Sequence, residues 1–189
     1  MAIEQLFNIL LSEQPSILIP AHEEEIFSLI PELRACKGFE QNNPWHIYDV
    51  YEHILHVVDA VPNNLDIRVA ALFHDIGKPC VYTEDENGIG HFYDHWTQSK
   101  EIFMRFANQY QLDQNMITLV SNLIFYHDIN IDKLSDEQIR SLMNDIGIEH
   151  ISLLFNLKRA DLLAQSPQYH YLMENYDTQE KSVIKLYAK

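Results

Sequence analysis

A histidine and an aspartate, His74 and Asp75, stand side by side directly after the apolar helical run from Ile67 to Phe73. Both are ligands for divalent metal ions, and an apolar helix has no packing reason to end on such a pair. Successive helical side chains diverge by about 100°, so the two can share one ion only where the last turn opens. We expect Gly77 to end the helix in a left-handed conformation. The pair predicts a metal site.

A second histidine lies on an apolar helix face. In the segment VYEHILHVVDAV, the side of the helix that carries His53 also carries Val50, Val57 and Val61. These residues recur at the spacing of one helical face, so His53 projects toward the core. The alternative is a core histidine that serves packing alone. His56 stands about 60° from the centre of this face and is a second candidate for the same role.

A carboxylate occupies a comparable position later in the chain. In the segment ISLLFNLKRADLLAQ, Asp161 follows Leu157 by four residues and Leu154 by seven, which places it on a buried helix face. A lone buried carboxylate is very costly, and an arginine partner or a cation relieves the cost. A cation would also account for His53 and for the pair at residues 74 and 75.

Two further histidines extend apolar stripes in the same way. His127 closes the stripe of a helix that starts near Asp113, and His95 shares a face with Ile102 and Phe106. The candidate metal ligands are therefore His53, His74, Asp75, His95, His127 and Asp161. Six ligands are too many for one closed zinc site and suit a pair of ions with open positions. Their mixed nitrogen and oxygen atoms fit one or two divalent ions of manganese, iron, nickel, zinc or magnesium.

The order of these residues resembles the pattern of the HD superfamily, a histidine, a histidine–aspartate pair and a distant aspartate. The matching residues are His53, His74, Asp75 and Asp161. The segments YDVYEHILHVVDAV, HDIGKP, HFYDHWTQSKEI and KRADLLAQ make the region from about 45 to 165 most similar to the HD domain of bacterial tRNA nucleotidyltransferases. The nucleotidyltransferase head, with its glycine-serine turn and paired aspartates, has no counterpart before His53. Nucleotide addition to tRNA is therefore not expected.

The resemblance implies a role for each residue. By analogy with two-metal members of the superfamily, Asp75 bridges two ions, and His95 with His127 completes the second. The other ligands of the first ion are His53, His74 and Asp161. Lys78 is expected to contact a phosphate oxygen as a point charge, with a surface position as the alternative.

The implied activity is that of a metal-dependent phosphohydrolase, a phosphomonoesterase or phosphodiesterase. A metal-activated water would attack a nucleotide, a cyclic phosphodiester or another small phosphate ester. Two alternatives stay open. One is a di-iron oxygenase of the same superfamily, which would activate dioxygen instead of water. The other is a non-catalytic regulatory HD domain that binds a nucleotide or a partner protein.

The rest of the chain predicts an all-α fold. Its 189 residues and 47% hydrophobic content suit one domain over 1–189, an HD-domain helical bundle with flanking helices. Helices are predicted near Ile3–Leu11 and Glu23–Leu29, and a last helix from Met173 to Lys189. The longest non-helical stretch, from Gly77 to Tyr93, is turn-rich. We expect it to form a short hairpin beside the metal site, as a lid or specificity loop, with His91 and Tyr93 as candidates for the pocket wall.

The net charge of −15 opposes binding to long nucleic acids or to an anionic membrane. A small phosphorylated substrate such as a nucleotide remains the expected partner, and the oligomeric state is left open. No apolar stretch is long enough to span a bilayer and no basic leader is present, so a cytoplasmic protein is expected. Cys36 and Cys80 predict neither a disulfide framework nor a thiolate zinc site. Asp128 is expected in a loop or cap, and surface or boundary positions are expected for His22, His46, His150 and His170.

Overall fold

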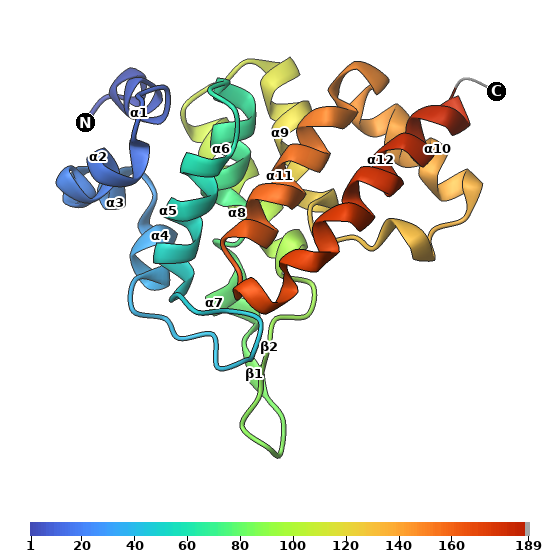
Figure 1. The fold of residues 1–189 in the computed structure, drawn as a ribbon. Helices are drawn as coiled ribbons and strands as arrows, with labels where there is room; N and C mark the ends of the chain where they lie inside the picture. Colours follow the sequence, from blue (N-terminus) through green and yellow to red (C-terminus); the bar gives the residue numbers. More distant parts are fainter. Residues whose placement is uncertain (188–189) are drawn as a thin grey trace.

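The computed structural model describes residues 1–187, and within them the predicted all-α bundle is confirmed (Figure 1). The α-helices are α1 (Ile3–Leu10), α2 (Pro15–Ala21), α3 (Glu23–Leu29), α4 (Pro31–Cys36), α5 (Val50–Ala60), α6 (Leu65–Phe73), α7 (Lys78–Val81), α8 (His95–Gln109), α9 (Gln114–Tyr126), α10 (Asp136–Ile146), α11 (Ile151–Leu163) and α12 (Met173–Tyr187). Short 3-10 turns are η1 (Ile131–Lys133), η2 (Ile148–His150) and η3 (Pro167–Leu172), and the strands are β1 (Thr83–Glu84) and β2 (Gly90–His91). Among the described helices, none has the length and apolar character needed to cross a membrane.

Polar side chains start the helices that carry the predicted ligands. Asp49 caps α5 by accepting a hydrogen bond from the N–H of Glu52 at 2.7 Å, and Asn64 caps α6 through the N–H of Ile67 at 3.2 Å. Asp113 caps α9 in the same way. Each cap pairs an N–H group that the helix itself leaves free, which stabilises the helix by about 1 kcal/mol. The caps fix where these helices begin.

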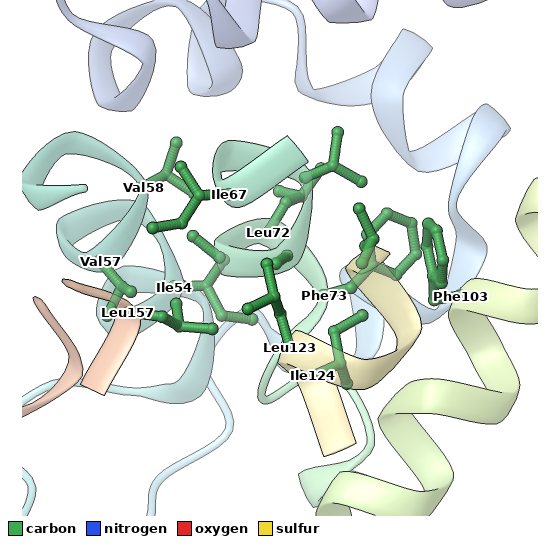
Figure 2. Close-up of a cluster of buried hydrophobic side chains, with 14 of the residues drawn as sticks. Ile54, Val57, Val58, Ile67, Leu72, Phe73, Phe103, Leu123, Ile124 and Leu157 are labelled. Atoms are coloured by element: carbon green, nitrogen blue, oxygen red, sulfur yellow. The ribbon is translucent and has the colours of Figure 1, made fainter. Parts of the chain in front are cut away.

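Helix α6 lies at the centre of the bundle. It packs against α5, α8, α9 and α11, and its residues from Ile67 to Phe73 are all buried. Figure 2 shows part of the resulting apolar cluster, which includes Ile54, Val57, Val58, Ile67, Leu72, Phe73, Phe103, Leu123, Ile124 and Leu157. A helix that is surrounded on all sides needs no polar face. The end of α6 therefore delivers His74 and Asp75 into the protein interior, where both are at most 1% exposed.

The predicted left-handed conformation of Gly77 is wrong. Its backbone has φ −80° and ψ −12°, which is right-handed, and it leads into the short helix α7. A Cβ atom at Gly77 would lie 2.6 Å from the backbone nitrogen of Ser99 and 2.7 Å from the backbone oxygen of His95. The Gly77 N–H also donates to Ser99 Oγ at 2.9 Å. Glycine is needed here because the turn after Asp75 presses directly against the start of α8.

The predicted hairpin is confirmed. Strand β1 pairs antiparallel with β2 and projects from one end of the bundle (Figure 1). The prediction that Gly77–Tyr93 lacks helix is wrong at its beginning, where Lys78–Val81 form α7. The base of the hairpin is tied to the preceding loop, because the Gly90 N–H donates to the Asn42 carbonyl at 2.8 Å. The hairpin residues Gly90 and His91 line the same pocket as Asp75, so the hairpin lies beside the predicted site, as expected.

The N-terminal region contains more helix than predicted. Helices α1 and α3 match the predicted segments, whereas α2 and α4 were not predicted. Each of these two begins with a proline, Pro15 and Pro31, at its first position. Proline suits that position because its fixed φ matches the first turn and its missing N–H would be unpaired anyway. The predicted last helix agrees with α12 as far as Tyr187, and Lys189 lies outside the described residues.

The close approach at Gly77 leads to a first prediction. Gly77→Ala should lower the free energy of unfolding by about 1–3 kcal/mol, because the added methyl group meets backbone atoms that cannot move aside cheaply. Gly77→Asn should be at least as harmful, whereas a left-handed helix stop would tolerate asparagine better than alanine. Urea denaturation of the three proteins measures this. Equal stability of Gly77→Ala and the unsubstituted protein would contradict the packing explanation.

Candidate metal centre

All six predicted ligands converge at one place inside the bundle. They come from the middle of α5, the end of α6, the start of α8, the end of α9 and the last turns of α11: His53, His74 with Asp75, His95, His127 and Asp161. The Asp161 side chain is 13% exposed, and the side chains of the other five are at most 6% exposed. Residues more than a hundred positions apart are therefore brought together in a largely dry interior.

The first group of ligand atoms surrounds one oxygen of Asp75. His53 Nε2 lies 3.2 Å from Asp75 Oδ2 and 3.0 Å from Asp161 Oδ1. His74 Nε2 lies 3.3 Å from the same Asp75 oxygen. The ligand atoms of His53, His74, Asp75 and Asp161 all lie within 4.8 Å of one another, a separation that suits a single ion.

The second group surrounds the other oxygen of Asp75. His95 Nε2 lies 3.0 Å from Asp75 Oδ1, and His127 Nε2 lies 3.6 Å from it. These three residues form a second set whose ligand atoms fit around one ion. Asp75 therefore belongs to both groups and faces each with a different oxygen, so it could offer one oxygen to an ion in each group.

The hydrogen bonds of the histidines test whether the site suits metal. His74 Nδ1, His95 Nδ1 and His127 Nδ1 each lie 2.6–2.9 Å from the backbone carbonyl three residues earlier. A carbonyl oxygen only accepts, so Nδ1 carries the proton, and in the neutral ring Nε2 presents a lone pair. His95 Nε2 and His127 Nε2 then face each other at 3.2 Å, both as acceptors, beside a carboxylate oxygen.

Such a group of acceptors repels itself unless a cation lies among them. Oδ2 of Asp75 is buried and accepts no well-aligned hydrogen bond, although Lys78 Nζ lies 2.6 Å away. Orphaned buried acceptors are rare in folded proteins. The donor set and its orphaned oxygen therefore fit divalent metal ions. The Nδ1 bonds to carbonyls are also the outer-sphere contacts that orient metal-binding histidines.

The electrostatics of the site favour ionised carboxylates and neutral imidazole at His127. Burial raises the pKa of Asp75, but the neighbouring imidazoles and the Lys78 ammonium outweigh it, so the pKa lies well below its usual range. Burial likewise raises the pKa of Asp161, but the adjacent imidazoles of His53 and His74 together outweigh it, so this pKa also lies well below its usual range. Burial lowers the pKa of His127. Burial also lowers the pKa of His53, yet the adjacent carboxylates of Asp161 and Asp75 raise it to about 9.

Lys78, predicted to contact phosphate or to lie on the surface, is 4% exposed and lines the pocket beside the cluster. Its Nζ donates to Gln41 Oε1 at 2.8 Å and lies 3.2 Å from His46 Nε2. His46 Nδ1 donates to Asn43 Oδ1, so Nε2 is the acceptor for the Lys78 ammonium. Burial lowers the pKa of His46 to about 2, which keeps the ring neutral.

The predicted surface or boundary position of His46 is therefore incomplete, because its ring reaches the pocket wall. Gln41 was not predicted at all. Both lie in the loop between α4 and α5, where no helical period indicates which side chains point inward. The sequence carries no signal that would have found them.

Lys158 is a third residue near the site that was not predicted. It is 2% exposed and donates to the backbone carbonyls of His127 and Ile129, which follow the end of α9. Burial lowers the pKa of this ammonium to about 8. The sequence does indicate that Lys158 points inward. It lies four residues after Leu154 and three before Asp161, on the same helix face as both.

The structure decides between the two histidines of α5. His53 is fully buried in the cluster, whereas His56 is exposed and stacks on Tyr48 with ring centroids 4.2 Å apart. His91 and Tyr93 both line the pocket beside the cluster, as predicted. Asp128 follows α9 in a turn, which agrees with its predicted loop position, and also reaches the pocket wall.

The HD domain family model matches residues 46–170. The chain belongs to the HD domain family. The match includes all six residues of the buried cluster and agrees with the predicted family-like core of about 45–165. This match is to the HD domain family as a whole. The closer similarity to tRNA nucleotidyltransferases therefore stays a prediction. No curated protein matches the chain.

The shared carboxylate leads to a second prediction. Asp75→Asn should abolish binding of both ions. The asparagine side chain is uncharged, and it offers one carbonyl oxygen where aspartate offers two carboxylate oxygens. His127→Ala should lower the number of bound manganese ions from two to one per chain. Elemental analysis after dialysis against manganese measures both. His56→Ala is the matched control and should bind as much as the unsubstituted protein; full binding by Asp75→Asn would refute the bridging arrangement.

Proposed function

We propose that this HD domain is a metal-dependent phosphohydrolase that acts on a small phosphate ester, a nucleotide or cyclic phosphodiester among them. The observation that carries the proposal is Asp75, whose two oxygens face two separate groups of ligand atoms. HD domains are generally hydrolase-like, and a buried His/Asp cluster fits such an enzyme. The proposed metal ligands are those named above, and the proposed catalytic residues are Asp75 and Lys78.

The histidines and Lys78 have different roles in the proposed reaction. When divalent ions are bound, they supply an activated water and positive charge for the phosphate. The rings of His74, His95 and His127 are held in place by their Nδ1–H bonds to backbone carbonyls. These side chains therefore need to move little during the reaction. Lys78 lines the pocket, and an anionic phosphate oxygen is a stronger acceptor for its ammonium than the neutral His46 ring. The ligand set suits manganese, iron, nickel, zinc or magnesium.

The surroundings of the cluster favour a small substrate. The cluster opens into a pocket of about 300 Å³ between the hairpin and the loop that precedes α5. This volume is at the lower end for ligand pockets. The net charge of −15 opposes binding of long nucleic acids. We place the protein in the cytoplasm as one domain, consistent with two free cysteines, one buried and one exposed.

A third prediction tests the activity. The manganese-loaded protein should hydrolyse a generic phosphoester such as bis(p-nitrophenyl) phosphate or p-nitrophenyl phosphate. Asp75→Ala should lose metal and hydrolysis together, while circular dichroism shows nearly unchanged helix content. His56→Ala should keep both. Retained hydrolysis in Asp75→Ala would overturn the assignment, and oxygen uptake by the iron-loaded protein would indicate the oxygenase alternative instead.

A fourth prediction concerns Lys78. Lys78→Met should lower kcat/KM by about 100-fold, because one charged donor to the phosphate is lost. Metal content should stay unchanged, since the ammonium is not a ligand. Lys78→Arg should recover part of the loss, and Lys100→Met, outside the pocket, should have no effect. Steady-state kinetics with elemental analysis measure this, and unchanged kinetics in Lys78→Met would show that the lysine serves packing alone.

A further inference from the structure

The pocket beside the metal cluster offers very little positive charge. Among the described residues that line it, Lys78 is the one lysine or arginine, whereas Asp75, Asp128 and Asp161 are acidic. The ammonium of Lys78 already has Gln41, His46 and Asp75 as neighbours. Arginine and lysine are the side chains that pair with phosphate oxygens most strongly. Beyond the phosphate at the cluster, a second or third phosphate would find no cationic side chain on this wall.

The mouth of the same pocket is aromatic. Tyr93 is 72% exposed and Trp45 is 43% exposed, and both line this pocket, so their rings present apolar surface at its opening. The rings of His91 and Tyr93 are stacked, with centroids 5.2 Å apart and planes 7° from parallel. Trp96 also lines the pocket. These aromatic side chains line the same pocket as Asp75, His95 and His127 of the buried cluster.

The backbone holds the hairpin side of the mouth in place. A Cβ atom at Gly90 would lie 2.3 Å from the Gln41 carbonyl oxygen, so β2 packs directly on the loop before α5. Asp94, next to Tyr93, adopts φ 62° and turns the chain into α8 at His95. Aspartate adopts this left-handed conformation more readily than most residues, and here it sets the direction in which the chain enters α8. Tyr93 therefore lies between Gly90, which packs on the loop before α5, and Asp94, which precedes α8.

From these observations we infer that the substrate carries a single phosphate group and one flat ring, as a nucleoside monophosphate does, and that polyphosphates are excluded. The phosphate enters toward the cluster and Lys78, and the ring stacks on Tyr93 at the mouth. Tyr93 is the residue that determines specificity for the ring. This inference rests on the proposed hydrolysis and adds the class of substrate to it.

The test compares three substrates of the manganese-loaded protein: adenosine monophosphate, adenosine triphosphate and ribose 5-phosphate, which lacks the ring. The kcat/KM for adenosine monophosphate should exceed the other two by about tenfold or more, within the usual range for base stacking on an aromatic side chain. Tyr93→Leu should raise KM for adenosine monophosphate about tenfold with kcat unchanged, and leave both constants for ribose 5-phosphate unchanged. Tyr93→Phe should restore the KM.

The control is Tyr171→Leu, since Tyr171 is 71% exposed but does not line this pocket. It should leave all three substrates unaffected. Equal turnover of the triphosphate, or an equal loss for both monophosphates in Tyr93→Leu, overturns the inference while the hydrolase proposal stands. Hydrolysis of none of the three counts against the hydrolase proposal. Tryptophan fluorescence titration with adenosine monophosphate then decides the inference separately: binding weakened by Tyr93→Leu supports it, and no binding overturns it.

Discussion

The buried carboxylate of Asp75 is the group on which the centre of this protein depends. Its charge lies in the interior at 1% exposure, and each oxygen faces a different set of imidazole nitrogens. A buried charge is tolerated only with compensating partners. Lys78 supplies one positive charge at 2.6 Å, and the two ligand groups have the composition that divalent ions require. The helices α5, α6, α8, α9 and α11 are arranged so that their ligands meet at this one side chain.

The histidines reach Asp75 by a shared local device. His74, His95 and His127 lie at helix ends or beginnings, and each ring donates Nδ1–H to the carbonyl three residues before it. This bond fixes the tautomer and aims Nε2 at the carboxylate. A helix end leaves carbonyl oxygens unpaired, so the bond also satisfies groups of α6 and α9 that would otherwise lack partners. The same hydrogen bonds thus complete the helices and orient the histidines of the buried cluster.

Helical periodicity was sufficient to predict most of the site. His53 and Asp161 each break an apolar face, and a polar residue on such a face needs a specific reason to be there. The same reasoning missed Gln41 and His46, because a loop has no period. It also misjudged Gly77: a glycine after a helix suggests a left-handed stop, whereas here the missing side chain lets the backbone of α8 approach to within contact. That approach depends on His95 and Ser99, which lie 18 and 22 positions further along the chain.

The sequence by itself predicted the helical fold, the histidines and aspartates of the buried cluster, with His53 or His56 from one helix, and the acidic character that opposes polyanions. These follow from spacing, residue chemistry and charge. Tertiary structure alone decided that His53 and not His56 faces the centre, and that Asp75 divides its two oxygens between two groups. It also decided that the loop before α5 and the hairpin form the pocket wall around Lys78. The reason is that periodicity reports which face of a helix is buried, but only the packing of several helices and loops sets which atoms meet there.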